Sequence, residues 1–94
     1  MIRVTIWNEY KHEREYEAIG KVYPAGIHGC LAEFLGKQDD FRIRTATFDM
    51  PEHGLTQAVL DDTDVLILWS HALQDEFSDE VAARVQQHVL AGMG

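Results

Sequence analysis

Residues 64–71 read D-V-L-I-L-W-S-H, an apolar run that ends in a serine and a histidine. A strand that is apolar at every position is typical of a parallel sheet with helices on both faces, whereas a half-exposed antiparallel strand alternates apolar and polar residues. The run therefore predicts a parallel strand over Val65–Trp69. Parallel strands need long crossover connections, so the same run favours an α/β fold.

Two other segments are expected to be strands of the same sheet. Ile2–Trp7 alternates apolar and polar residues, and Phe41–Phe48 is rich in β-branched and aromatic residues. Arg42 and Arg44 project from one face of the second segment, which favours an edge position for it.

Three segments carry apolar residues at helical spacing, and each is expected to pack on the sheet. The first begins at Gly26, and Gly36 lies close to its end. Its apolar positions are Ile27, Cys30, Leu31, Phe34 and Leu35. Thr56 is expected to cap a short second helix and Ser78 a longer third one, which Gly92 ends. The apolar positions of the third helix are Val81, Ala82, Val85 and Val89.

Alternating strands and helices predict a doubly wound, flavodoxin-like parallel sheet with strand order 2-1-3. Residues 1–94 are expected to form a single α/β domain. In this order the apolar third strand lies at an edge, so we expect the chain to be the N-terminal part of a larger domain that covers this edge. An obligate homo-oligomer that covers the edge is the rival explanation.

The link between the first strand and its helix, residues 8–25, is much longer than the usual connection of about 2–6 residues. Its length indicates a lid or a binding loop, within which Ala18, Ile19 and Val22 could form a short helical turn. Its charged residues predict that it is solvated; they are Lys11, Glu13, Arg14, Glu15, Glu17 and Lys21.

The charge and the cysteine content exclude several classes of protein. The formal net charge is -8, with 16 acidic against 8 basic residues, which argues against nucleic acid or an anionic membrane as a partner. A single cysteine, Cys30, excludes an internal disulfide and fits a reducing compartment; we expect it to be a small buried side chain. Neither a signal peptide nor an apolar run of about 20 residues is present, so a cytoplasmic location is expected.

The carboxyl ends of the strands are the expected site, because open α/β sheets bind ligands there. Polar side chains gather at this end of the predicted sheet: Asn8, Glu9, His12, His28, His53 and His71. Histidine is a common zinc ligand, and His28 and His71 form the best candidate pair because each begins or follows a regular element beside the switch point. The alternative is that these histidines cap helices or bond to backbone carbonyls.

Four segments together resemble the trehalose-utilisation (ThuA-like) family: W-N-E-Y, Y-P-A-G-I-H-G, R-T-A-T-F-D-M-P-E-H-G-L-T and L-D-D-T-D-V-L-I-L-W-S-H. The resemblance covers essentially the whole chain. It implies a class I glutamine-amidotransferase-like protein with a flavodoxin-like fold, a role in sugar metabolism and a chain more than twice as long. Amidotransferase activity is not expected, since the cysteine nucleophile of those enzymes follows a later strand and Cys30 is not at an equivalent place.

Our leading hypothesis is a sugar-utilisation protein with a metal-dependent, carbohydrate-modifying site. His28 and His71 would bind a divalent metal, with zinc as the candidate, and the metal would polarise a sugar hydroxyl or carbonyl. The substrate-binding residues would be Asn8, Glu9, His12 and His53. The alternative is a non-enzymatic ligand-binding or assembly subunit with the same fold. The expected partners are a small carbohydrate and, in a homo-oligomer, further copies of the chain, but neither nucleic acid nor membrane.

Overall fold

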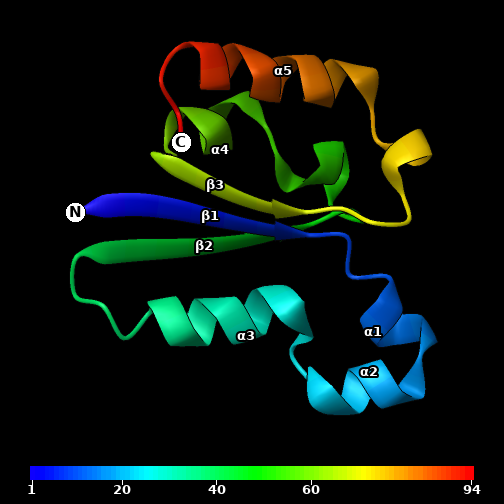
Figure 1. Cartoon of the computed structure of the whole chain (residues 1–94). Helices are drawn as coiled ribbons and strands as arrows, with labels where there is room; N and C mark the ends of the chain where they lie inside the picture. The colour runs from blue at the N-terminus through cyan, green and yellow to red at the C-terminus, as the bar shows by residue number, and fades with distance from the viewer.

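A parallel three-stranded sheet forms the centre of the molecule (Figure 1). The computed structural model describes residues 1–94. The strands are β1 (Ile2–Asn8), β2 (Phe41–Thr47) and β3 (Val65–Trp69), in the order β2-β1-β3. Both pairings of β1 are parallel. The predicted α/β fold, the strand order and the edge position of β2 are confirmed.

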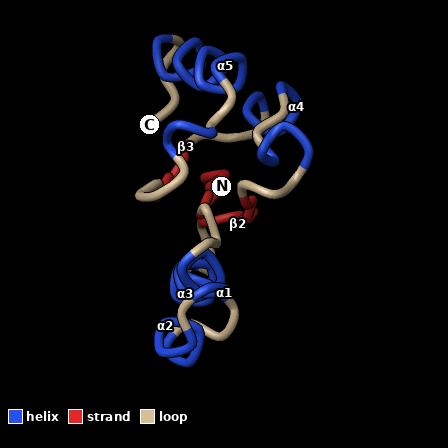
Figure 2. The backbone as a smooth tube through the Cα atoms, turned by 90° about the vertical axis from the view of Figure 1, so that its right-hand side faces the viewer, coloured by secondary structure: helices blue, strands red, loops and turns tan.

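Helices cover both faces of the sheet, as a flavodoxin-like arrangement requires. On one face lie α1 (His12–Glu15), α2 (Glu17–Val22) and α3 (Gly26–Leu35), and on the other lie α4 (Gln57–Asp61) and α5 (Asp79–Leu90), as Figure 2 shows in the turned view. Two short 3-10 segments, η1 (Pro51–Gly54) and η2 (Gln74–Glu76), precede α4 and α5. None of the helices has the length and apolar character needed to cross a bilayer.

The best-packed core lies between the sheet and the α4/α5 layer. It contains the buried side chains Trp7, Ala46, Leu55, Leu60 and Val81. The two predicted helix caps are confirmed. The Thr56 hydroxyl accepts the backbone N–H of Val59 at 3.2 Å, and the Ser78 hydroxyl accepts that of Val81 at 3.4 Å.

The predicted apolar faces of two helices were too wide. Cys30 is exposed and Phe34 is 65% exposed, so the prediction of a buried cysteine is wrong. α3 packs through Ile27, Leu31 and Leu35, which are partly buried. On α5, Val89 is 52% exposed. Each helix therefore contacts the rest of the fold through a narrower face than its apolar spacing predicts.

The outer edge of β3 is partly paired and partly open. The backbone N–H of Gly94 donates to Asp64 O at 3.0 Å, and the N–H of Leu66 donates to Gly94 O at 2.9 Å, the pattern of a parallel pairing. Farther along the strand, Leu68 and Trp69 are 43% and 36% exposed. The expectations of a larger domain and of a homo-oligomer both concern this edge, and both stay predictions.

The long link between β1 and α3 is ordered into two helices, more structure than the single helical turn that the sequence predicts. Glu13 on α1 is only 7% exposed, so the prediction that all charges of the link are solvated is wrong for this residue. α1 folds back over the carboxyl end of β1, and Glu13 turns inward.

Candidate functional site

The carboxyl ends of β1 and β3 lie side by side, and the polar residues that follow them meet there. Asn8, the last residue of β1, pairs with Trp69, the last residue of β3. Ser70 and His71 follow β3 directly, and the His12 ring of α1 lies 5.5 Å from that of His71. This is the switch point of the sheet, where the ligands of such folds bind.

Glu9 holds the segment after β3 in place. The side chain is 3% exposed, and its carboxylate accepts the backbone N–H of Ala72 at 3.0 Å, that of Leu73 at 2.6 Å and the Ser70 hydroxyl at 3.1 Å. Burial alone would raise the pKa of Glu9, but these donors outweigh it and hold the pKa below its ordinary value. Glu9 therefore positions the loop that carries His71, and its predicted contact with substrate stays a prediction.

Asn8, Glu13 and His28 form a buried chain of hydrogen bonds. The amide nitrogen of Asn8 lies 2.5 Å from Glu13 Oε2 and 3.1 Å from His28 Nδ1. The backbone N–H of Ile27 donates to the same Glu13 oxygen at 2.9 Å. Burial lowers the pKa of His28, and the Glu13 carboxylate only partly offsets this effect. The predicted residues Asn8 and His28 are thus brought together, with Glu13 between β1 and α3.

His12 and His71 meet Trp69 and Tyr16 in a cluster of four rings, the ring cluster. The His12 ring lies 5.5 Å from both Trp69 and His71 and 5.7 Å from Tyr16, and Trp69 stacks on His71 at 5.8 Å. His71 is exposed, and Tyr16 is 54% exposed. The cluster presents aromatic faces to solvent at the end of β3.

His53 is engaged within the fold. Its Nδ1–H donates to Phe48 O at 2.9 Å, and its Nε2 accepts the backbone N–H of Ser78 at 3.0 Å. The ring also stacks on Phe48 at 4.4 Å and contacts Phe77 at 4.7 Å. Both nitrogens are therefore used by the chain itself, which matches the alternative reading that a rim histidine bonds to backbone groups.

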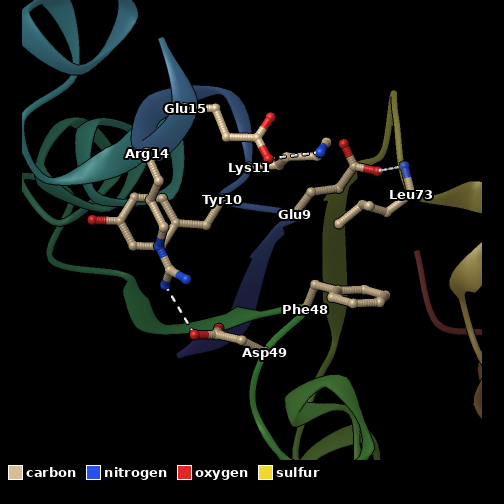
Figure 3. A pocket seen from close by; sticks show the side chains of 8 residues that line it. All are labelled: Glu9, Tyr10, Lys11, Arg14, Glu15, Phe48, Asp49 and Leu73. Carbon is tan, nitrogen blue, oxygen red and sulfur yellow. Dashed lines mark hydrogen bonds and ion pairs between the residues drawn. The ribbon is translucent and has the colours of Figure 1, made fainter. Parts of the chain in front are cut away.

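A cavity of about 220 Å³ opens between α1 and the ends of the strands (Figure 3). Its lining residues are Glu9, Tyr10, Lys11, Arg14, Glu15, Phe48, Asp49 and Leu73. The charges across it are paired: Arg14 lies 4.1 Å from the Tyr10 ring centre and 2.9 Å from the Asp49 carboxylate. Hydrogen bonds from Thr47 and Arg14 lower the pKa of Asp49. The cavity is polar, but its charges are already partly neutralised.

The metal prediction gains no support from the side-chain arrangement. Zinc sites use three or four converging ligands, and no group of three or more His, Cys, Asp or Glu side chains is placed to hold a metal ion. The pair His28 and His71 contacts different neighbours, Asn8 and Tyr10 in one case and His12 and Trp69 in the other. The divalent metal, zinc included, stays a prediction.

Sequence reasoning missed three residues of the site. Glu13 could not be told apart from Glu15 and Glu17 in the charged link. Tyr10 adopts φ 60° and places its ring 4.8 Å from His28. Gly26 adopts φ 80°, and a Cβ on it would lie 2.4 Å from His28 Cε1. The sequence pointed here only through the position of His28 at the start of its helix.

These features define the class: a flavodoxin-like α/β protein with a polar and aromatic site at the switch point of its sheet. The model of a family described as trehalose utilisation (ThuA) matches residues 3–94, nearly the whole chain. The chain therefore belongs to the ThuA trehalose utilisation family, and a general role in trehalose utilisation follows from this membership. A search of curated proteins finds no match.

Proposed function

We propose that the chain binds a neutral sugar of the trehalose type at the carboxyl ends of β1 and β3. The observation that carries the proposal is the ring cluster, in which Trp69 and Tyr16 are 36% and 54% exposed at the end of β3. Sugar rings present flat C–H faces that pack on aromatic rings, so an exposed aromatic surface at a switch point suits such a ligand.

Polar atoms near the ring cluster have hydrogen-bonding capacity to spare. Asn8 Oδ1, His12 Nδ1 and Glu13 Oε1 are buried, and each lacks a hydrogen-bond partner within the chain. Buried polar atoms without partners are costly, and the hydroxyl groups of a sugar are donors that suit these acceptors. These atoms are enclosed, so a ligand would reach them only after a movement of α1.

The cavity supports partial enclosure of the sugar. Its volume of about 220 Å³ lies below the roughly 300–1,000 Å³ of typical ligand sites, so a disaccharide would extend beyond it. Trp69 and Tyr16 do not line this cavity, so they would contact only a part of the ligand that extends beyond it.

Calorimetric titration with trehalose tests the proposal. One aromatic contact contributes about 0.5–1.5 kcal/mol to the free energy of binding. Trp69→Ala removes this contact and should therefore weaken binding by roughly 2- to 10-fold. Trp69→Phe keeps an aromatic face and should retain most of the affinity. Phe34→Ala removes an aromatic ring that is 65% exposed on α3 and is the matched control. Absence of binding to the unaltered chain, or full affinity in Trp69→Ala, contradicts the proposal.

The predicted metal is tested separately. Metal analysis of the purified chain, with His28→Ala and His71→Ala, shows whether either histidine is a ligand. Metal that is lost in both variants supports a metal-dependent site. Sugar binding that survives a chelator favours the non-enzymatic alternative.

A further inference from the structure

The Asn8–Glu13–His28 chain of hydrogen bonds determines where the proton of one histidine lies. We propose that Glu13, acting through the Asn8 amide, fixes His28 as a neutral ring that carries its proton on Nε2. His28 then donates a hydrogen bond to an uncharged oxygen of the bound ligand and is not a metal ligand. The role toward the ligand depends on the sugar-binding function proposed above; the position of the proton does not.

Glu13 is the fixed end of the chain. Its carboxylate is 7% exposed and accepts the backbone N–H of Ile27 as well as the Asn8 amide. Burial alone would raise the pKa of Glu13, but these donors hold the pKa below its ordinary value. An ionised carboxylate only accepts hydrogen bonds, so the atom that Asn8 directs at Glu13 Oε2 must be a donor.

This requirement fixes the orientation of the Asn8 amide. The oxygen and nitrogen of an amide are distinguished by their hydrogen-bond partners. A reversed amide would bring its oxygen to 2.5 Å from Glu13 Oε2, an unfavourable contact of two acceptors. The amide nitrogen therefore faces Glu13, and its second hydrogen points to His28 Nδ1 at 3.1 Å.

The orientation of the amide then fixes the tautomer of His28. A ring nitrogen that accepts a hydrogen bond carries no proton, and in neutral imidazole the proton is then on the other nitrogen. A charged ring would turn an Nδ1–H toward the donor of Asn8, so this arrangement also disfavours protonation. His28 Nε2 has no hydrogen bond within the chain and is not among the enclosed atoms without partners, so this N–H is available.

The consequence is a preference for one kind of ligand. Metals bind the unprotonated nitrogen of imidazole, and here that nitrogen faces Asn8. A neutral N–H suits a hydroxyl or carbonyl oxygen, whereas a charged imidazolium would favour an anion. The geometry therefore suits an unphosphorylated sugar.

Gly26 and Tyr10 keep the ring in place. A Cβ at Gly26 would lie 2.4 Å from Cε1 and 2.6 Å from Nδ1 of His28, so only glycine leaves room for the ring. The Tyr10 ring packs edge-to-face on the imidazole at 4.8 Å, and its edge lies 3.1 Å from the same Cβ position. Gly26 therefore leaves room for both rings.

Heteronuclear NMR of the histidine ring nitrogens tests the proton position in the absence of sugar. At a pH of about 8, above the ordinary histidine pKa of about 6.5, His28 should show an unprotonated Nδ1 and a protonated Nε2. Asn8→Asp replaces the donor by an acceptor and should move the proton to Nδ1. Glu13→Gln can present either an oxygen or a nitrogen to Asn8 and should give a mixture. Glu15→Gln, an exposed change on the same helix, should leave His28 unaltered. A proton on Nδ1 in the unaltered chain overturns the proposal.

Titration with trehalose and with trehalose phosphate tests the role toward the ligand. The unaltered chain should prefer the neutral sugar, and Asn8→Asp or Glu13→Gln should reduce this preference by about 5-fold, the value of one neutral hydrogen bond. An unchanged preference in a variant whose tautomer has changed overturns the donor role. If neither sugar binds the unaltered chain, the proposed function fails and the donor role with it, while the NMR result still decides the proton position.

Discussion

Ser78 donates its backbone N–H to Nε2 of His53 at 3.0 Å, and this contact joins η1 to the beginning of α5. The opposite nitrogen of the same ring donates to the Phe48 carbonyl at 2.9 Å. One imidazole thus bridges two backbone groups that lie 30 positions apart in the chain, at residues 48 and 78. His53 therefore links the segment after β2 to the beginning of α5, and its predicted contact with substrate stays a prediction.

Replacement of His53 should therefore affect stability. His53→Ala leaves a backbone N–H and a carbonyl without their partner, and it removes the stacking on Phe48. The free energy of unfolding should fall by about 2 kcal/mol in urea denaturation. His71→Ala removes an exposed imidazole for which the structure shows no such bonds and should change it by less than about 0.5 kcal/mol. Equal effects of the two changes would show that the His53 bridge is not stabilising.

Glu9 should make stability depend on pH. Its folded pKa lies below the unfolded value of about 4.3, so its contribution is fully present above that value and is lost as the pH falls through the folded pKa. Glu9→Gln should lower the free energy of unfolding by about 2 kcal/mol at neutral pH. The difference from the unaltered chain should shrink in urea denaturation in strong acid, and a difference that stays constant would contradict this role.

Gly26 should be intolerant of a side chain. Gly26→Ala places a Cβ against the His28 ring and forces a non-glycine residue to φ 80°, at an expected cost of about 1–3 kcal/mol. The NMR signals of His28 should shift as its ring is displaced. Gly92 also has a positive φ, of 117°, but no atom lies within 4 Å of a Cβ built there. Gly92→Ala should therefore leave the His28 signals in place, whatever its effect on stability.

His88 should titrate above the ordinary histidine pKa of about 6.5. Hydrogen bonds to the Arg84 carbonyl and to Asp61, across the α4/α5 contact, raise its pKa. Its contribution to stability is fully present below the unfolded pKa and is lost as the pH rises through the folded one. An NMR titration should show the raised midpoint, and Asp61→Asn should lower it. Asp75→Asn, an exposed change in η2, should not.

The sheet could be predicted from the sequence because burial leaves a direct pattern in it. Val65–Trp69 is apolar at each position, and the caps Thr56 and Ser78 act within one turn of chain. The width of a helix's contact with the sheet leaves no such pattern. The spacing that places Leu31 against the sheet also includes Cys30, and the side of α3 that faces the sheet decides which of them is covered.

The sequence predicted that polar residues gather at the carboxyl ends of the strands, but it could not predict which groups each of them contacts. The carboxyl ends of parallel strands converge, so the rim histidines were found from position alone. Glu9 and His53 both bond to backbone groups of the segment between β3 and α5. The sequence does not show how this segment folds, so it could not show these contacts. Glu13 carries the same charge as Glu15 and Glu17 in the same link, and its burial results from α1 turning back onto the N–H of Ile27.

The glycine at the start of α3 has a consequence for recognising distant relatives. Because Gly26 leaves room for the His28 ring, and because Asn8 and Glu13 orient it, the arrangement requires four residue types at two fixed spacings. These spacings are N-x-x-x-x-E, which begins at the last residue of β1, and G-x-H in the first turn of α3. A chain of this fold that keeps both spacings should carry the proton of this histidine on Nε2, even where the rest of its sequence has diverged. A chain with alanine in place of the glycine should not.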